Sequence, residues 1–249
     1  MVSIGVLVLT YNEEDNIEEC LESVSWVDEI VVVDSYSQDD TLELARQYTS
    51  NIYQREFDDF ATQRNYGLDQ MESEWVLVVD ADERVTSDLQ EEVLNKLSNP
   101  EASGYKIPRK NYFLGKWIKY CGWYPDYTLR LFKVADNRYS GLVHEGLKIE
   151  GTVEKLEGTL IHYTYRDLEH YLNKINHYTT LDAQKKYQAG KRKRLLYILM
   201  RPVLEFIKKY ILKKGFLLGS QGLILAILSS YYQFLKYIKL WEKYNSDES

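Results

Sequence analysis

Two aspartates separated by one residue are the clearest candidates for chemistry. Asp80 and Asp82 enclose Ala81 and directly follow Trp75–Val79, an apolar run with the pattern of a buried strand. One carboxylate of such a pair can bind a divalent cation and the other a ribose hydroxyl, and the cation stabilises the charge of a departing diphosphate. The alternative is a solvated acidic turn, because Glu83 comes next. The pattern predicts a site for a nucleotide-linked substrate.

Two further polar clusters follow apolar runs in the first part of the chain. The candidate ligand contacts in them are Thr10, Tyr11, Asn12 and Glu13 after the first run, and Asp34 and Ser35 after the second. We predict that Asp34 accepts a hydrogen bond from a base or a ribose. Ser37, Asp39 and Thr41 are expected only to cap the next helix. The alternative is that the whole second cluster is a cap.

A third helical pattern, Phe60–Met71, carries Gln63 and Arg64. Arg64 is predicted to stack on or hydrogen-bond a uracil, or to face a diphosphate, because a guanidinium group suits both partners. The alternative is an exposed arginine paired with Asp58 or Asp59.

A parallel sheet would place these residues at one edge. Short apolar runs alternate with helical patterns through the first hundred residues, which is typical of strands joined by right-handed crossovers. Ligands of open α/β sheets bind beyond the carboxyl ends of the strands, so the three polar clusters are predicted to form one site. Asn12 is the expected N-cap of the first helix.

The pattern changes after about residue 103. Tyrosine-rich extended segments with turns at 114–115 and 121–122 predict added antiparallel strands. Helical periodicity returns at Leu168–Gln188, and a helical tail then runs to Tyr244.

Charge is distributed unevenly along the chain. The net charge is −7, but residues 1–100 carry 24 acidic and 5 basic side chains, whereas residues 185–214 carry eleven Lys or Arg and only Glu205. The acidic first half argues against nucleic acid as a partner. Two isolated cysteines, no signal peptide pattern and no apolar run of about 20 residues predict a cytoplasmic protein without a membrane span.

The basic segment 185–214 requires its own explanation. Its lysines and arginines alternate with apolar and aromatic residues, as in helices that lie in an anionic membrane surface. We therefore expect the protein at the inner face of the cytoplasmic membrane. The alternative is a helical domain that packs on the catalytic unit or forms a homodimer.

The motifs and their order resemble family-2 glycosyltransferases with the GT-A fold. The segments that carry the resemblance in the first half are LVLTYNEEDNIEECLESV, VVVDSYSQDDT, ATQRNYGL and WVLVVDADE. The later segments YPDYTLRLFK, GLVHEGL and LIHYTY, and the helical tail, resemble the subgroup that includes lipopolysaccharide-core β-glucosyltransferases.

The resemblance implies an α/β chain of two parts. A GT-A catalytic domain would span residues 1–180, with the nucleotide-sugar half at 1–100 and the acceptor half at 101–180. A basic amphipathic helical extension would span residues 181–249. The implied reaction is inverting transfer of a hexose, with UDP-glucose the first choice of donor, to a saccharide or envelope glycolipid. Mn²⁺ or Mg²⁺ would be bound by Asp80, Asp82 and His162.

An inverting reaction also needs a base on the acceptor side. The resemblance favours Glu145 as this base, and Asp126 is the second catalytic candidate, as the base or to orient hydroxyls. The alternatives are a cap for Asp126 and, for Glu145, an ion pair with Lys148 or Arg130.

Three rival functions remain open at this point. A peptide S- or O-glycosyltransferase of the bacteriocin-modifying type shares similar motifs. A nucleotidyltransferase also uses strand-end carboxylates and a metal, but it normally has a glycine-rich basic loop near its N-terminus, where this chain has the acidic TYNEEDN. The last rival is an inactive scaffold that binds nucleotide.

Overall fold

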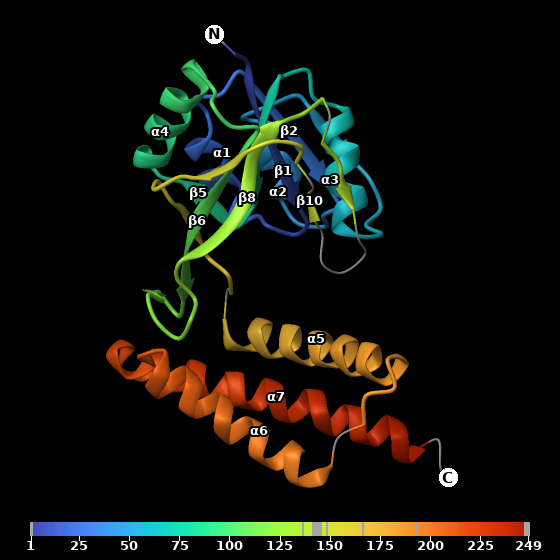
Figure 1. Ribbon diagram of the computed structural model, residues 1–249. Coiled ribbons are helices and arrows are strands. Elements are labelled where there is room, and N and C mark those ends of the chain that lie inside the picture. Colours follow the sequence, from blue (N-terminus) through green and yellow to red (C-terminus); the bar gives the residue numbers. More distant parts are fainter. Residues whose placement is uncertain are drawn as a thin grey trace. The chain divides into compact units, whose positions relative to one another are not determined.

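The computed structural model describes residues 2–135, 137–140, 146–147, 149–165, 167–192 and 194–246 (Figure 1). Its internal contacts divide the chain into two units. The sheet unit comprises Met1–Lys110 and Asp126–His162, and the helical unit comprises Asn111–Pro125 and Tyr163–Ser249. The division after His162 differs from the boundary near residue 180 that the sequence suggested, because the helix at 168–188 packs with the C-terminal helices.

The buried strand predicted at Trp75–Val79 is confirmed and extends to Asp80. The strands are β1 (Ile4–Thr10), β2 (Glu29–Asp34), β3 (Ile52–Gln54), β4 (Trp75–Asp80), β5 (Glu83–Val85), β6 (Gly104–Phe113), β7 (Lys116–Trp117), β8 (Asp126–Lys133), β9 (Tyr139–Ser140), β10 (Gly146–Leu147), β11 (Val153–Lys155) and β12 (Leu160–His162). The main sheet has the order β3-β2-β1-β4-β8-β6-β12-β5. Strands β1 to β4 pair in parallel, whereas β8 pairs antiparallel with β4 and β6. A parallel sheet extended by antiparallel strands is what the sequence predicted.

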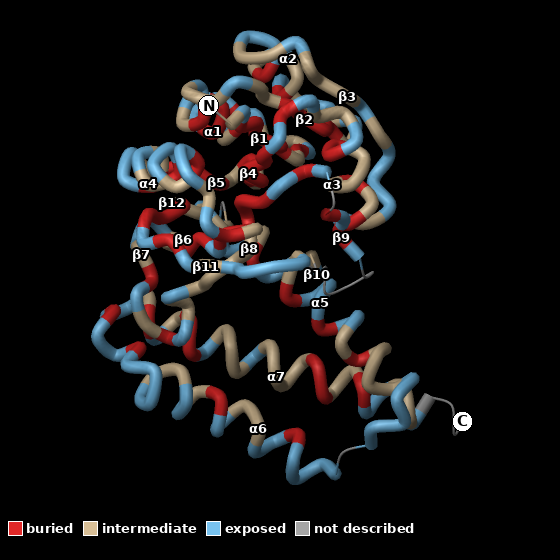
Figure 2. The backbone as a smooth tube through the Cα atoms, turned by 45° about the horizontal axis from the view of Figure 1, so that its top comes forward, coloured by how far each residue is buried: buried red, intermediate tan, exposed pale blue. Residues whose placement is uncertain are grey.

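Helices cover both faces of the central strands. The helices of the sheet unit are α1 (Ile17–Ser23), α2 (Thr41–Ala45), α3 (Phe60–Asp69) and α4 (Ser87–Ser98). Val6 and Val8 of β1 lie in one core cluster with side chains of α1, α2 and α4, and Leu7 lies in a second cluster with α3. Because successive side chains of a strand point to opposite faces, near-continuous apolar strands are buried on both sides. Figure 2 shows these strands as buried.

The first helix begins later than expected. Its N-cap is Asn16, so the predicted cap at Asn12 is wrong. Asn12 has φ 52°, outside the helical region, and its side-chain oxygen accepts a hydrogen bond from the backbone N–H of Gln38 at 2.8 Å. The polar segment after β1 is therefore a loop bound to the loop after β2.

The helical unit consists of a helix bundle and the segment Asn111–Pro125, which comes earlier in the chain. Its elements are α5 (Leu168–Gln188), α6 (Leu195–Ile207), the π-helical turn η1 (Lys208–Leu212), the 3₁₀ turn η2 (Gly215–Leu218) and α7 (Ser220–Ser246). Helix α7 packs against both α5 and α6. Phe113 and Cys121 share a core cluster with Tyr171 of α5 and Leu225 of α7, which explains why 111–125 belongs to this unit. Within the described ranges, no helix is long and apolar enough to cross a membrane.

Candidate active site

The three polar clusters lie together at the carboxyl edge of the parallel strands. Thr10 at the end of β1 is in register with Asp34 at the end of β2, and Leu9 is in register with Asp80 at the end of β4. Neighbouring strands lie about 5 Å apart. The predicted convergence of the clusters is therefore confirmed.

Side chains join the loops after β1 and β2. The Ser37 hydroxyl accepts a hydrogen bond from the backbone N–H of Asn12 at 2.9 Å, and the Thr41 hydroxyl accepts one from Glu13 at 2.8 Å. Asp39 accepts from the backbone N–H of Thr41, but the N-cap of α2 is Asp40, which makes no side-chain cap hydrogen bond, so the predicted caps at Ser37, Asp39 and Thr41 are wrong. Ser37 has a different role, because it holds the two loops together. The backbone at Asn12 and Glu13, which are predicted to contact the ligand, is thus held in place by these hydrogen bonds.

Asp34 is fully buried in this loop structure. Its carboxylate accepts hydrogen bonds from the backbone N–H of Ser37 at 3.0 Å, from the Ser37 hydroxyl and from the Gln54 amide at 3.1 Å. Asp34 therefore orders the loop after β2. Its contact with a base or a ribose stays a prediction.

Gln63 fixes the position of Ser35. Its amide nitrogen donates to the Ser35 hydroxyl at 3.1 Å, and its oxygen accepts from Arg55 at 2.7 Å. Only 1% of Gln63 is exposed, whereas 54% of Tyr11 is exposed at the end of β1. Tyr11 is thus accessible to a ligand, whereas the buried Gln63 holds Ser35 in position.

Asp80 lies between two arginines. Its carboxylate oxygens are 2.6 Å from Arg130 and 3.3 Å from Arg64. Burial alone would raise the pKa of Asp80, but the guanidinium groups of Arg130 and Arg64 outweigh it and hold the pKa well below the usual range of a carboxyl. The alternative partners of Arg64 are engaged elsewhere, since Asp58 pairs with Arg55 and Asp59 caps α3.

Glu83 is completely buried beneath this pair. One carboxylate oxygen accepts from Arg130 at 2.8 Å and lies 3.4 Å from Arg109, and the other accepts from the backbone N–H of Asp80 at 3.0 Å. The alternative of a solvated acidic turn is therefore wrong for Glu83. A buried carboxylate is retained here because three donors satisfy it.

Asp82 faces His162. The two side chains approach to 3.4 Å between a carboxylate oxygen and Nε2, and both are largely buried. The antiparallel pairing of β12 with β5 brings them together, because His162 is in register with Glu83. Among the described residues, no three His, Cys, Asp or Glu side chains gather as a metal site. Asp82 and His162 form a two-residue donor set of one oxygen and one nitrogen.

The two candidate bases differ in what the structure says of them. Asp126 begins β8 and accepts two hydrogen bonds from Arg109, at 3.0 and 2.6 Å, with 35% of its side chain exposed. Asp126 is thus ion-paired with Arg109, and its role as a base or in orienting hydroxyls stays a prediction. Glu145 and Lys148 lie outside the described residues. Arg130, the other suggested partner of Glu145, pairs with Asp80 and Glu83.

Comparison with known families identifies the family of the chain. The family model described as glycosyl transferase family 2 matches residues 5–145, more than half of the chain. The chain belongs to glycosyl transferase family 2. It is therefore an enzyme of sugar transfer, and the nucleotidyltransferase alternative is disfavoured.

Relatives of this family 2 glycosyltransferase match along nearly the whole chain. The lipopolysaccharide core biosynthesis glycosyltransferase LpsC of Rhizobium meliloti is 29% identical over 255 residues, covering 97% of this chain and 93% of that protein. An uncharacterized glycosyltransferase of Rickettsia typhi is 25% identical over 263 residues, covering 97% and 88%. The crystal structure of S. aureus TarS 1–349 in complex with UDP-GlcNAc has a TM-score of 0.50 at 17% identity, covering 99% and 92%. The family and this structural likeness support the GT-A fold.

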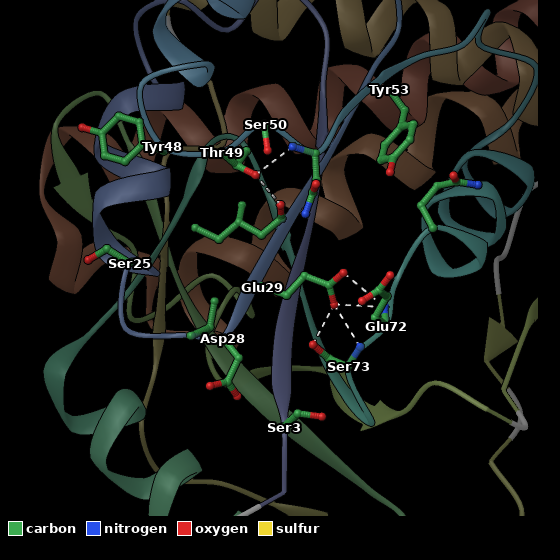
Figure 3. A pocket seen from close by; sticks show the side chains of 14 residues that line it. Ser3, Ser25, Asp28, Glu29, Tyr48, Thr49, Ser50, Tyr53, Glu72 and Ser73 are labelled. Carbon is green, nitrogen blue, oxygen red and sulfur yellow. Dashed lines mark hydrogen bonds between the residues drawn. The ribbon is translucent and has the colours of Figure 1, made fainter.

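One cavity of this glycosyltransferase lies at the opposite edge of the parallel strands. It measures about 690 Å³ and is lined by residues that precede the parallel strands (Figure 3). Glu29 accepts hydrogen bonds there from the backbone and hydroxyl of Ser73, and Asp28 accepts one from the backbone N–H of Ile4. These contacts hold the strand starts together. Ligands of open α/β sheets bind beyond the carboxyl ends of the strands, so the carboxyl edge is the candidate site.

Sequence reasoning missed three residues of the site. Glu83, Arg109 and Arg130 build the ion-pair network under Asp80 and beside Asp126. Arg130 carried a usable signal, because a charged residue within the apolar strand pattern TLRLF must find a buried partner.

Proposed function

We propose that this enzyme transfers a hexose from a UDP-sugar to a saccharide or glycolipid acceptor of the cell envelope, with inversion at the anomeric carbon. The observation that carries the proposal is the convergence of three strand-end polar clusters on one edge, with Asp82 next to His162. The similarity to LpsC supports an acceptor of the lipopolysaccharide core type.

The donor would bind along the loops after β1, β2 and β4. TarS, whose fold is similar, was solved with UDP-GlcNAc, which supports a UDP-linked donor. The residues we assign to the nucleotide-sugar are Thr10, Tyr11, Asn12, Glu13, Asp34, Ser35, Gln63, Arg64, Asp80, Ala81 and Asp82. Arg64 lies beside Asp80 and would meet the phosphates, since a guanidinium group binds phosphate oxygens in pairs.

The residues present fit a divalent cation. Asp82 and His162 offer an oxygen and an imidazole nitrogen close together, and Mg²⁺ or Mn²⁺ in such enzymes takes its other ligands from substrate phosphates and water. Both oxygens of Asp80 contact arginines, so Asp80 is the third candidate ligand, after these two. The bound cation would neutralise negative charge on the departing diphosphate.

The acceptor side requires a base. A bond forms between the acceptor oxygen and the anomeric carbon, the bond from that carbon to the donor phosphate oxygen breaks, and the acceptor proton passes to a carboxylate. We assign the proton to Glu145, because Asp126 already accepts two hydrogen bonds from Arg109. Asp126 would then orient acceptor or donor hydroxyls. Residues 1–100 would bind the donor and residues 101–180 the acceptor. The enzyme would work at the inner face of the cytoplasmic membrane.

A thermal-shift panel of nucleotide sugars, with and without Mn²⁺, tests the proposal. We expect UDP-hexoses to raise the melting temperature only when the metal is present, and Asp82→Asn to abolish this metal-dependent shift. If no UDP-sugar stabilises the wild-type protein with Mn²⁺, the proposed donor is wrong. Transfer assays on lipid-extracted envelope acceptors and on cysteine-containing peptides then identify the acceptor, and transfer to peptide alone would favour the bacteriocin-modifying type.

A further inference from the structure

Helix α6 leaves most of its apolar side chains exposed, unlike a helix that packs its whole apolar stripe on a protein core. Its outward half, which we call the α6 apolar face, is formed by Leu195, Leu196, Leu199, Val203, Leu204 and Ile207. These side chains are 40% to 71% exposed. Spacings of three and four residues place them on one half of the helix. Figure 2 shows α6 as exposed along most of its length.

The inward half of α6 contains two buried residues, the apolar Ile198 and the acidic Glu205. Glu205 is only 5% exposed and lies 3.4 Å from Arg201 and 3.9 Å from Lys208. On α7, Lys236 is similarly buried and lies 3.9 Å from Asp182 of α5. A surface helix normally turns its apolar stripe toward the core and its charges toward water. In α6 only Ile198 and Glu205 are buried, so most of its apolar side chains are left for an apolar environment outside the unit.

Basic residues flank the α6 apolar face at both ends. Exposed side chains include Lys191 and Arg194 before the helix and Lys213 and Lys214 after it. The segment 185–214 contains eleven basic residues and one acid, Glu205, which is buried in an ion pair. The described outward surface of this segment is therefore apolar in the middle and cationic at its ends.

We propose that the α6 apolar face rests in the surface of an anionic lipid bilayer, with the flanking cations on the lipid phosphates. A helix of this kind lies along the interface, and binding grows with buried apolar area and with attraction to anionic lipid. No described helix can cross the bilayer, which agrees with docking on one leaflet. The inference concerns the helical unit and stands independently of the proposed transfer reaction.

Charge argues against a second copy of the chain as the occupant of this face. Two copies that paired through α6 would bring basic ends against basic ends in either a parallel or an antiparallel arrangement, because both ends are cationic. Like charges at close range repel. An anionic bilayer neutralises the same residues.

Vesicle flotation of the full-length protein tests this inference. Phosphatidylcholine vesicles are compared with vesicles that also contain phosphatidylglycerol, at low salt. The variant Leu199→Asp/Val203→Asp places charges on two half-exposed positions, so folding is preserved, which circular dichroism verifies. Leu94→Asp is the matched control, because Leu94 of α4 is also half-exposed, at 46%.

We expect wild-type protein and Leu94→Asp to float with the phosphatidylglycerol vesicles. The α6 variant should bind about tenfold more weakly or worse, since each aspartate must leave the apolar layer. Wild-type protein that stays unbound, or an α6 variant that binds like wild type, overturns the inference. A lipid-free dimer in analytical ultracentrifugation that the α6 variant dissociates assigns the face to a second copy instead. The UDP-sugar thermal shift is measured on the same samples, so failure of donor binding is recognised separately.

Discussion

Asp80 is held by arginines from two different elements. Arg64 comes from α3 and Arg130 from β8, and the second also neutralises the buried Glu83. A buried ion pair adds little stability compared with an apolar replacement of the whole group, but loss of one partner leaves an unpaired charge in the core. The network therefore holds Asp80 rigidly in the proposed donor site. Substitution of any single member is expected to destabilise the fold.

Arg130→Leu is expected to lower the free energy of unfolding by about 3 kcal/mol at neutral pH, because Glu83 and Asp80 lose their shared cation. The pKa of Asp80 is depressed in the folded protein, so its contribution is present above its unfolded value of about 4 and is lost as the pH falls through the folded value. The difference in the free energy of unfolding between wild type and variant should consequently become smaller below about pH 4. Urea denaturation followed by circular dichroism measures it.

Arg138→Leu provides the matched control for this effect. Arg138 pairs with Asp69 at 2.8 Å, but both side chains are about half-exposed. Removal of a solvated pair should cost less than about 1 kcal/mol. Equal losses in the two variants would contradict a special role of the buried network.

Glu145→Gln and Asp126→Asn separate the two candidate bases. We expect Glu145→Gln to lower kcat by at least about 100-fold while the UDP-sugar thermal shift is unchanged, because a lost base affects only proton transfer. Asp126→Asn keeps its contact with Arg109 in part and should cost less. Single-turnover transfer assays measure both, and the reverse order of effects would make Asp126 the base.

Spacing along the chain predicted which residues gather, but not their ion-pair partners. Asp80 and Asp82 could be located because each follows a buried strand directly. The contact of Asp80 with Arg130 joins residues 50 positions apart on antiparallel neighbours, and their register depends on the packing of the whole sheet. His162 was found only through family resemblance, since a lone histidine after a short strand carries no local signal.

At the scale of elements, local periodicity was sufficient for strands β1 to β4 and for α5, whose limits of Leu168–Gln188 are as predicted. The predicted start of α1 was wrong because asparagine is a good N-cap at both positions 12 and 16. The hydrogen bond from the backbone N–H of Gln38 to Asn12 holds Asn12 in a loop, so the helix begins after Asn16. The orientation of α6 was also beyond local reasoning. An amphipathic pattern shows that two faces differ, but which face is covered depends on the packing of Ile198 against α5 and α7.

Gly222→Ala should destabilise the helical unit although alanine is the better helix former. A Cβ added at Gly222 would lie 1.9 Å from the carbonyl oxygen of Gly215, a backbone atom that cannot move away alone. The gain of about 1 kcal/mol in helix propensity is therefore outweighed by a clash that costs about 2 kcal/mol or more. Thermal melting by circular dichroism measures the difference.

Gly146→Ala is the control for this substitution, because an added Cβ there meets no atom of the described residues within 4 Å. Its melting temperature should stay close to that of the wild type, since surface changes typically alter stability by less than about 0.5 kcal/mol. A stabilised Gly222→Ala variant would mean that η2 and α7 do not approach as closely as described.

For the molecule as a whole, the main electrostatic feature is that residues 1–100 are acidic and residues 185–214 are basic. Residues 1–100 have 19 more acidic than basic side chains, whereas residues 185–214 have ten more basic than acidic ones. An anionic surface attracts the second segment and repels the first. The attraction therefore acts on the same segment that carries the α6 apolar face.

Binding to phosphatidylglycerol vesicles should therefore weaken with salt without being abolished. A rise from about 0.1 M to about 1 M salt shortens the Debye length from about 10 Å to about 3 Å, which screens the flanking cations. We expect an increase of about tenfold in the dissociation constant from flotation, with residual binding through the α6 apolar face, which salt does not screen. Lys213→Ser/Lys214→Ser should already bind more weakly at low salt and respond less to added salt. Binding that is identical at both salt concentrations would show that the cations contribute nothing, and the choice of an anionic surface over a neutral one would then lose its basis.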